Sequence, residues 1–354
     1  MPNRDDRPLL ALTLGDVAGI GPEVIARAWR ETPLRTLART FVVGSRSVLE
    51  RALARLGVDA VVEEITRPED ARPTARVIPC LEATNEDVAD VPPGLVDPRA
   101  GRAAYDYLVT AADLAMSGRI DAITTLPLNK EALRSAGILH PGHTEILAER
   151  CGVSDHAMML YLGPPLGAGD AGLGVVHVTL HVPLRQVFDL VTEASVEEKI
   201  FLADRAFRPL TGGRAPRVGV AALNPHAGEG GLFGNEESRI ITPAVARAKA
   251  AGIDVTGPIA ADTLFVRAVA GEFDVVVAMY HDQGHVALKT LSFDRAVNVT
   301  LGLPIVRTSV AHGTAYDIAW TGKAETSSLI EAVRVAARLV EGRRWQAQPV
   351  LESS

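Results

Sequence analysis

Short apolar runs recur along the chain, and each ends in glycine, proline or polar residues. Runs of this length, bounded by turn residues, are typical of buried strands. We predict strands at residues 9–14, 41–44, 120–126, 172–180, 217–223, 274–279 and 304–310, and short strands with a long surface loop within the irregular residues 58–98, which contain six prolines. Between them, the spacing of apolar positions indicates helices at residues 101–116, 145–150 and 324–342, and from about Glu236 and Ala315 onwards. Strands that alternate with helices predict an α/β fold.

A glycine-rich turn follows the first predicted strand. Gly15, Gly19 and Gly21 precede Pro22, which the first turn of a helix tolerates. Strand, glycine turn and helix in this order are typical of a nucleotide-binding unit, but the spacing G-x-x-x-G-x-G differs from the dinucleotide fingerprint. A turn that only starts a helix, without a ligand, fits these residues equally well.

Composition limits the classes of function. The chain has 354 residues, of which 47% are hydrophobic and 22% charged, as in a soluble protein of one large unit or two domains. The net charge of −7 argues against a nucleic-acid partner. Cys80 and Cys151 form no metal-like cluster, which suits a reducing compartment. We find no signal-peptide pattern and no apolar run of transmembrane length, so we expect a cytoplasmic protein with no membrane partner.

Three histidines lie just past the ends of predicted strands: His181, His226 and His281. Open α/β sheets bind ligands outside the carboxyl ends of their strands, so these histidines are candidate metal ligands. Hydrogen-bonded structural histidines remain an equally good interpretation. Imidazole suits zinc, and also cobalt, nickel or iron, and three protein ligands leave open positions for a substrate. His177 lies inside its strand and is predicted to be a core residue.

His281 and His285 have the i, i+4 spacing of a helical zinc motif. Gly284 lies between them and the glutamate of H-E-x-x-H is absent, so we reject a metalloprotease. Lys289 is a candidate general base or anion contact, although most lysines are solvated. Arg307 interrupts an apolar strand and must find a partner, for which a carboxylate or a phosphate is the natural choice.

His143 and Thr144 follow a glycine turn, just before a predicted helix. Free N–H groups and the dipole make a helix N-terminus suitable for phosphate. Thr144 as a simple N-cap, with His143 as an exposed loop residue, is the alternative interpretation.

Several segments together resemble the 4-hydroxythreonine-4-phosphate dehydrogenase family. They span nearly the whole chain, and NPHAGEGG and YHDQG are the most specific. The segments are GDVAGIGPE (15–23), LNKEALRSAG (128–137), PGHTEILAE (141–149), HVPLR (181–185), LNPHAGEGGLFGNEE (223–237), ADTLF (261–265), YHDQGHVALK (280–289) and VNVTLGLPIVRTSVAHGTAYDIAWTGKA (297–324).

The resemblance implies a fold like that of isocitrate and isopropylmalate dehydrogenases, with two α/β/α lobes around a cleft. We expect residues 1–130 plus 305–354 in the first lobe and 131–304 in the second. It also implies a homodimer with the active site at the interface. The implied reaction oxidises a C3 hydroxyl with NAD or NADP and then releases carbon dioxide, and its product feeds pyridoxal phosphate in pyridoxine biosynthesis.

The resemblance also assigns residues. It implies that a divalent metal (zinc, magnesium or cobalt) is held by His181, His226 and His281, with His281 supplied by the partner subunit. Implied substrate contacts are His143, Thr144, Lys289, Asn298 and Arg307. We hypothesise that Lys289 is a base or proton relay, that Thr144 and Arg307 bind the phosphate, and that Asp262 orients a ligand or the cofactor.

The substrate branch stays open. Asn129, His285 and the segment YDIAWTGKA are more similar to the branch that oxidises D-threonate or D-erythronate 4-phosphate. A third relative acts on an unphosphorylated aromatic cis-diol acid, and His143, Thr144 and Arg307 argue against it. Two other classes remain: a metal-dependent hydrolase or lyase, and a phosphate-binding protein without activity.

Overall fold

The computed structural model describes residues 6–164, 170–292 and 295–346, and the chain forms two compact units. Unit 1 comprises Met1–His156 and Leu303–Val340, and unit 2 comprises Ala157–Gly302 and Glu341–Ser354. The predicted division, 1–130 plus 305–354 and 131–304, cuts the chain at different residues. Helices α5 (Lys130–Ser135) and α6 (His143–Cys151) pack on α4 (Pro98–Met116), which keeps residues 131–156 in unit 1.

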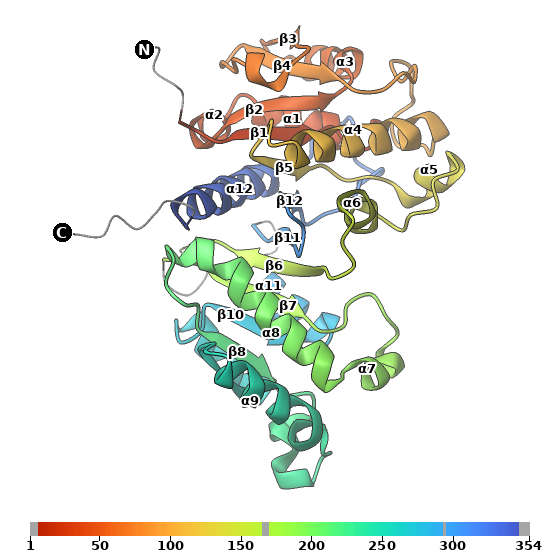
Figure 1. The fold of residues 1–354 in the computed structure, drawn as a ribbon. Helices are drawn as coiled ribbons and strands as arrows, with labels where there is room; N and C mark the ends of the chain where they lie inside the picture. The colour runs from red at the N-terminus through yellow and green to blue at the C-terminus, as the bar shows by residue number, and fades with distance from the viewer. Residues whose placement is uncertain (1–5, 165–169, 293–294, 347–354) are drawn as a thin grey trace, which may run out of the picture. The chain divides into compact units, whose positions relative to one another are not determined.

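Unit 1 is built on a parallel sheet, which confirms the α/β class for this part of the chain (Figure 1). Its strands lie in the order β3, β4, β2, β1, β5, β12, each parallel to the next. The central strands are buried along their whole length, as their continuous apolar sequences predict. The strand bounds are β1 Leu9–Thr13, β2 Arg39–Gly44, β3 Val61–Glu64, β4 Val77–Glu82, β5 Ala122–Thr125 and β12 Val306–Val310.

Helices connect and cover these strands. Asp97 is the N-cap residue of α4: its side chain accepts a hydrogen bond from the Arg99 backbone N–H, and Pro98 is the first residue of the helix. It packs against β1, β2 and β5. The remaining helices of this unit are α1 Gly21–Ala28, α2 Thr32–Leu37, α3 Arg46–Leu56 and the first part of α12 Ser327–Gln346.

The glycine turn after β1 is filled by protein. A Cβ on Gly15 would lie 2.4 Å from the Pro127 carbonyl oxygen, and one on Gly21 would lie 2.3 Å from that of Leu14. Residues 14–21 are all buried. The glycines therefore allow close packing of backbone on backbone, which favours a turn that starts α1 over a nucleotide cradle.

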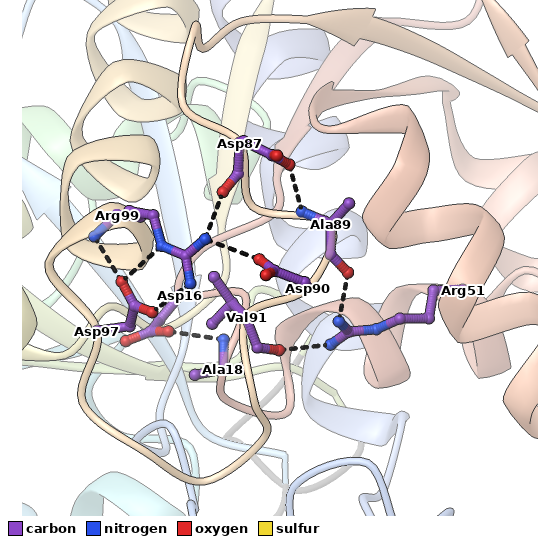
Figure 2. Close-up of polar contacts among 9 residues, drawn as sticks. All are labelled: Asp16, Ala18, Arg51, Asp87, Ala89, Asp90, Val91, Asp97 and Arg99. Carbon is purple, nitrogen blue, oxygen red and sulfur yellow. Dashed lines mark hydrogen bonds and ion pairs between the residues drawn. The ribbon is translucent and has the colours of Figure 1, made fainter.

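Two arginines hold part of the proline-rich segment after β4, which we had predicted to be a surface loop (Figure 2). Arg51 donates to the carbonyl oxygens of Ala89 and Val91, at 2.5 and 3.0 Å. Arg99 pairs with the Asp90 carboxylate at 2.7 Å. The loop therefore has a fixed course beside the glycine turn, and Gly94 donates its N–H to Ala18 O at 2.8 Å.

The prediction of a helix near Ala315 is wrong. Residues 316–322 form a series of turns. Ala315 and Trp320 have positive φ angles of 44° and 63°, which a right-handed helix does not allow. The Trp320 indole N–H donates to the Val17 carbonyl at 3.1 Å, so this segment packs on the glycine turn instead.

Unit 2 contains a mixed sheet with the order β11, β6, β7, β10, β8, β9. β6 is antiparallel to both β11 and β7, whereas β7, β10, β8 and β9 run parallel. The bounds are β6 Ala157–Leu162, β7 Leu173–His177, β8 Val218–Ala221, β9 Val255–Ile259, β10 Val275–Ala278 and β11 Val297–Leu301. Its helices include α7 Leu184–Leu190, α8 Glu193–Phe207, α9 Thr242–Ala250, α10 Ala261–Val269 and α11 His281–Leu291. None of the helices in the described ranges is long and apolar enough to cross a membrane.

Candidate active site

The three predicted metal ligands follow three adjacent strands of unit 2. β10 lies between β7 and β8 and is parallel to both, so their carboxyl ends share one edge of the sheet. His181 follows β7, His226 follows β8, and His281 follows β10 as the first residue of α11. The prediction that these histidines follow strand ends is therefore confirmed, and their role as metal ligands stays a prediction.

The structure brings two of the three histidines together within one chain. The rings of His181 and His281 lie 5.7 Å apart between centroids. His226 instead lies against Phe233, with ring centroids 5.9 Å apart in an edge-on arrangement. Among the described residues, no group of three histidine, cysteine or acidic side chains is arranged to hold a metal ion.

A carboxylate orients two of these histidines. The Nδ1 atom of His226 lies 3.0 Å from Glu229 Oε2, and that of His281 lies 2.7 Å from Asp282 Oδ1. Because an ionised carboxylate only accepts hydrogen bonds, Nδ1 carries the proton in each ring. Nε2 then presents its lone pair, which is the usual arrangement of metal-binding histidines. The donor set therefore fits a divalent cation.

The loop that carries His226 has an unusual backbone. His226, Ala227, Gly228, Glu229 and Gly230 all have positive φ angles, between 44° and 80°. Each non-glycine residue in this left-handed region costs about 1 kcal/mol or more. His226 is also well exposed, with 66% of its side-chain surface accessible. A strained backbone that presents an exposed imidazole is typical of a ligand-binding loop.

A buried pair of histidines lies behind His281. The His285 ring stacks on the His281 ring at 3.8 Å and 9°, and its Nδ1 lies 3.2 Å from His177 Nε2. Burial, followed by the charges of His281 and Lys289, lowers the pKa of His285 to about 4. His285 is only 7% exposed, so it supports His281 and offers little surface to a substrate. His177 is a buried core residue, as predicted.

The other candidates of unit 2 lie on separate elements. Lys289 is half-buried on α11, two helical turns beyond His281. Asn298 lies on β11 opposite Leu160, and its Oδ1 is buried. Asp262 is exposed in the first turn of α10, where its Oδ1 accepts from the Thr263 N–H at 2.9 Å. Their predicted roles stay predictions.

Unit 1 carries the phosphate candidates. Arg307 lies buried on β12 and donates to Thr125 Oγ1 at 2.7 Å. Burial lowers its pKa to about 10, against the opposing charge of Glu145, so the guanidinium stays charged at neutral pH. His143 and Thr144 are the first two residues of α6. The N-cap residue, Gly142, has no side chain that could cap the helix.

His143 has a defined tautomer. Its Nε2 lies 3.1 Å from the Leu126 carbonyl oxygen, which can only accept, so Nε2 carries the proton and Nδ1 is an acceptor. Burial, and then the positive charge of Arg307, holds the pKa of His143 well below its ordinary value. A neutral ring with an open acceptor is suited to a hydroxyl group, whereas the charged Arg307 is suited to a phosphate.

Sequence reasoning missed the groups that orient these side chains. Glu229 and Asp282 lie inside the quoted segments NPHAGEGG and YHDQG, yet no role was assigned to them. A carboxylate one or three residues after a candidate ligand is the available signal. Asn129, noted as a branch difference, caps α5 by accepting from the Ala132 N–H at 2.9 Å.

Comparisons with known proteins agree with this architecture. The chain is 46% identical over 332 residues to D-threonate 4-phosphate dehydrogenase of Pectobacterium atrosepticum, which covers 94% of this chain and 99% of that protein. It is 48% identical to 4-hydroxythreonine-4-phosphate dehydrogenase of Beijerinckia indica, over 94% of this chain and 95% of that one. The crystal structure of 4-hydroxythreonine-4-phosphate dehydrogenase from Klebsiella pneumoniae matches with a TM-score of 0.85 at 43% identity, over 94% and 99% of the two chains.

A family model covers most of the same region. The model for pyridoxal phosphate biosynthetic protein PdxA matches residues 36–336, which include each of the three candidate metal ligands and Arg307. The match and the identities extend across both units. The chain therefore belongs to the PdxA family.

Proposed function

We propose that this protein is a metal-dependent dehydrogenase that oxidises the C3 hydroxyl of a four-carbon 3-hydroxy acid 4-phosphate with NAD or NADP, followed by loss of carbon dioxide. The observation that carries the proposal is the pair of carboxylate-oriented imidazoles, His226 and His281, at the strand ends of unit 2. The names of the relatives, all dehydrogenases of 4-phosphorylated acids, support the reaction class.

His181, His226 and His281 would hold the divalent cation: zinc, magnesium or cobalt. When bound, the cation supplies a Lewis acid for the substrate oxygens, and the nicotinamide accepts the hydride. The family resemblance implies a homodimer in which His281 serves the partner subunit. That arrangement stays part of the proposal.

The residues of unit 1 would bind the phosphate end. Arg307 offers a charged, planar donor, and the N-terminus of α6 at Thr144 offers backbone N–H groups. His143 would accept a hydrogen bond from a substrate hydroxyl through Nδ1, because its Nε2 proton is engaged by Leu126.

Lys289 is the proposed base or proton relay. Oxidation moves a hydride from C3 to the nicotinamide and a proton from the hydroxyl oxygen to the base. In the following step the bond to the carboxylate breaks, carbon dioxide leaves, and the electron pair stays on the substrate until a proton is returned. Asn298 would contact the substrate beside Lys289, and Asp262 would orient the cofactor.

The first candidate substrate is 4-hydroxythreonine 4-phosphate, as in pyridoxine biosynthesis. The second is D-threonate or D-erythronate 4-phosphate, and His285 favours it only through the resemblance of the segment HDQGH to that branch. Asn129 does not help to choose between the two substrates, because its side chain has a structural role as the N-cap of α5.

The test is a side-by-side assay of the three phospho acids with NAD and with NADP, followed by the absorbance of reduced nicotinamide. Unphosphorylated D-threonate is the matched control for the phosphate contacts. Reduction with one phospho acid and little with its unphosphorylated form is the expected result. If no acid is oxidised while phosphate is released or water is added or removed, the protein is a hydrolase or lyase instead.

A further inference from the structure

Gln283 joins the carboxyl ends of two neighbouring strands in unit 2. Its Oε1 accepts from the Met279 backbone N–H at 2.7 Å, and its Nε2 donates to the Ala222 carbonyl oxygen at 2.7 Å. Met279 directly follows β10, and Ala222 directly follows β8. We call this pair of hydrogen bonds the Gln283 bridge. It lies between the helix that begins with His281 and the loop that carries His226.

The side-chain amide satisfies both partners. Met279 offers a donor and Ala222 an acceptor, so the side chain between them must accept at one end and donate at the other. The partners also fix which way the amide faces. A glutamate would keep the bond from Met279 but would present an anionic oxygen to the Ala222 carbonyl.

Glu237 holds the same segment from the other side. Its Oε1 accepts from the backbone N–H groups of Leu223 and Asn224, at 2.9 and 2.7 Å. Its Oε2 accepts from the Asn224 side chain at 3.0 Å. Residues 222–224 are therefore fixed by both Gln283 and Glu237 immediately before the left-handed loop.

These contacts also support the left-handed loop that follows. The loop from His226 to Gly230 contains three non-glycine residues with positive φ, so it depends on its ends for support. The bridge connects one of those ends to the first turn of α11, where His281 pairs with Asp282. Movement of either segment would change the positions of two candidate ligands at once.

We propose that Gln283 is a positioning residue that fixes the loop of His226 against the helix of His281. In the proposed dimer these two histidines serve two cation sites, and Gln283 thereby sets the affinity of both sites for a divalent cation. The inference rests on the proposed function, because it takes these histidines to be metal ligands. Groups that orient metal ligands typically change affinity by 10–100-fold when removed.

The test compares cation binding in four full-length variants. Gln283→Glu loses only the hydrogen bond to Ala222. Gln283→Met loses both hydrogen bonds but keeps a side chain of similar size. Asp274→Asn is the control, because Asp274 links the opposite ends of the same two strands through Arg214 and Arg217. His226→Ala removes a candidate ligand. Chelator competition gives the zinc and cobalt dissociation constants, and the cobalt absorption spectrum reports ligand geometry, at a temperature where circular dichroism shows every variant folded.

We expect both Gln283 variants to bind at least about tenfold more weakly, with an altered cobalt spectrum, and Asp274→Asn to stay within about twofold of the unmodified protein. Unchanged affinity in both Gln283 variants overturns the inference. An equal loss in Asp274→Asn also overturns it, because the effect would then reflect sheet stability alone. If the unmodified protein binds no more tightly than His226→Ala, the metal site of the proposed function fails, and the inference fails with it.

Discussion

The two ends of the β8–β10 strand pair are held together in opposite ways. At the amino ends, Asp274 is almost fully buried and accepts hydrogen bonds from the side chains of Arg214 and Arg217 and from the Arg217 backbone N–H, at 2.8–3.1 Å. At the carboxyl ends, the Gln283 side chain links the two strands. The segments that follow these strand ends carry His226 and His281, whose side chains are partly exposed.

The difference separates stability from binding. At the amino edge, both oxygens of the Asp274 carboxylate accept hydrogen bonds from arginine groups. At the carboxyl edge, the carboxylates of Glu229 and Asp282 use only the Nδ1 side of each imidazole. The left-handed loop of His226, which follows β8, adds an energetic cost that the amino edge lacks. We therefore expect changes at one edge to affect cation binding and changes at the other to affect unfolding.

The largest effect should come from His226→Ala. Loss of one of three ligands removes a direct bond to the cation, so we expect no cation binding at micromolar concentrations and no turnover. Equilibrium dialysis and the nicotinamide assay check the two losses. Full turnover in this variant would show that the carboxyl edge is not the metal site.

Arg307→Lys should have the next largest effect, and it should weaken substrate binding without changing cation binding. Lysine keeps the charge but loses the planar pair of donors, so we expect kcat/KM to fall about 100-fold, mainly through KM. The cation dissociation constant should not change, because Arg307 is not one of the proposed cation ligands. A changed cation affinity with an unchanged KM would contradict the division of roles.

Asp282→Asn should weaken cation binding about tenfold, because the amide orients His281 without increasing its basicity. Asp282 is exposed, so the folded state should lose little stability. Isothermal titration calorimetry with zinc measures the affinity, and thermal unfolding of the metal-free protein is the control. An unaltered affinity would mean that the contact of His281 with Asp282 has no part in binding.

Asp274→Asn should have the smallest effect on binding and a clear effect on stability. Burial alone would raise the pKa of Asp274, but hydrogen bonds from Arg217 and Arg214 outweigh it and lower the pKa from 3.8 to about 2. A depressed carboxylate pKa stabilises the fold above pH 3.8, by about 2 kcal/mol, and this contribution disappears as the pH falls through about 2. Urea unfolding at pH 7 and at pH 3 should show a smaller difference between variant and parent at the lower pH. A constant difference would contradict the assigned cause.

The strands and the order of the site residues followed from the sequence because they depend on local patterns. The apolar runs that end near His181, His226 and His281 became β7, β8 and β10. β6, β9 and β11 were not predicted. β9 contains Gly257 and Pro258, which suit an edge strand but weaken the strand signal.

The parts that escaped prediction depend on contacts between distant residues. The bond from Gln283 to Ala222 joins positions 61 residues apart. The left-handed backbone of Ala227 has no local signature, because alanine rarely adopts it. The turn at Ala315 also depends on packing, since its sequence alone favoured a helix.

The most direct test of the proposed function is turnover after removal and return of the cation. The protein is treated with a chelator, dialysed and assayed with NAD or NADP and the best of the three phospho acids, before and after zinc, magnesium or cobalt is added. We predict that nicotinamide reduction disappears without the cation, returns when one of the three is added, and does not return in His226→Ala. Undiminished reduction in the chelated protein would contradict the metal-dependent dehydrogenase.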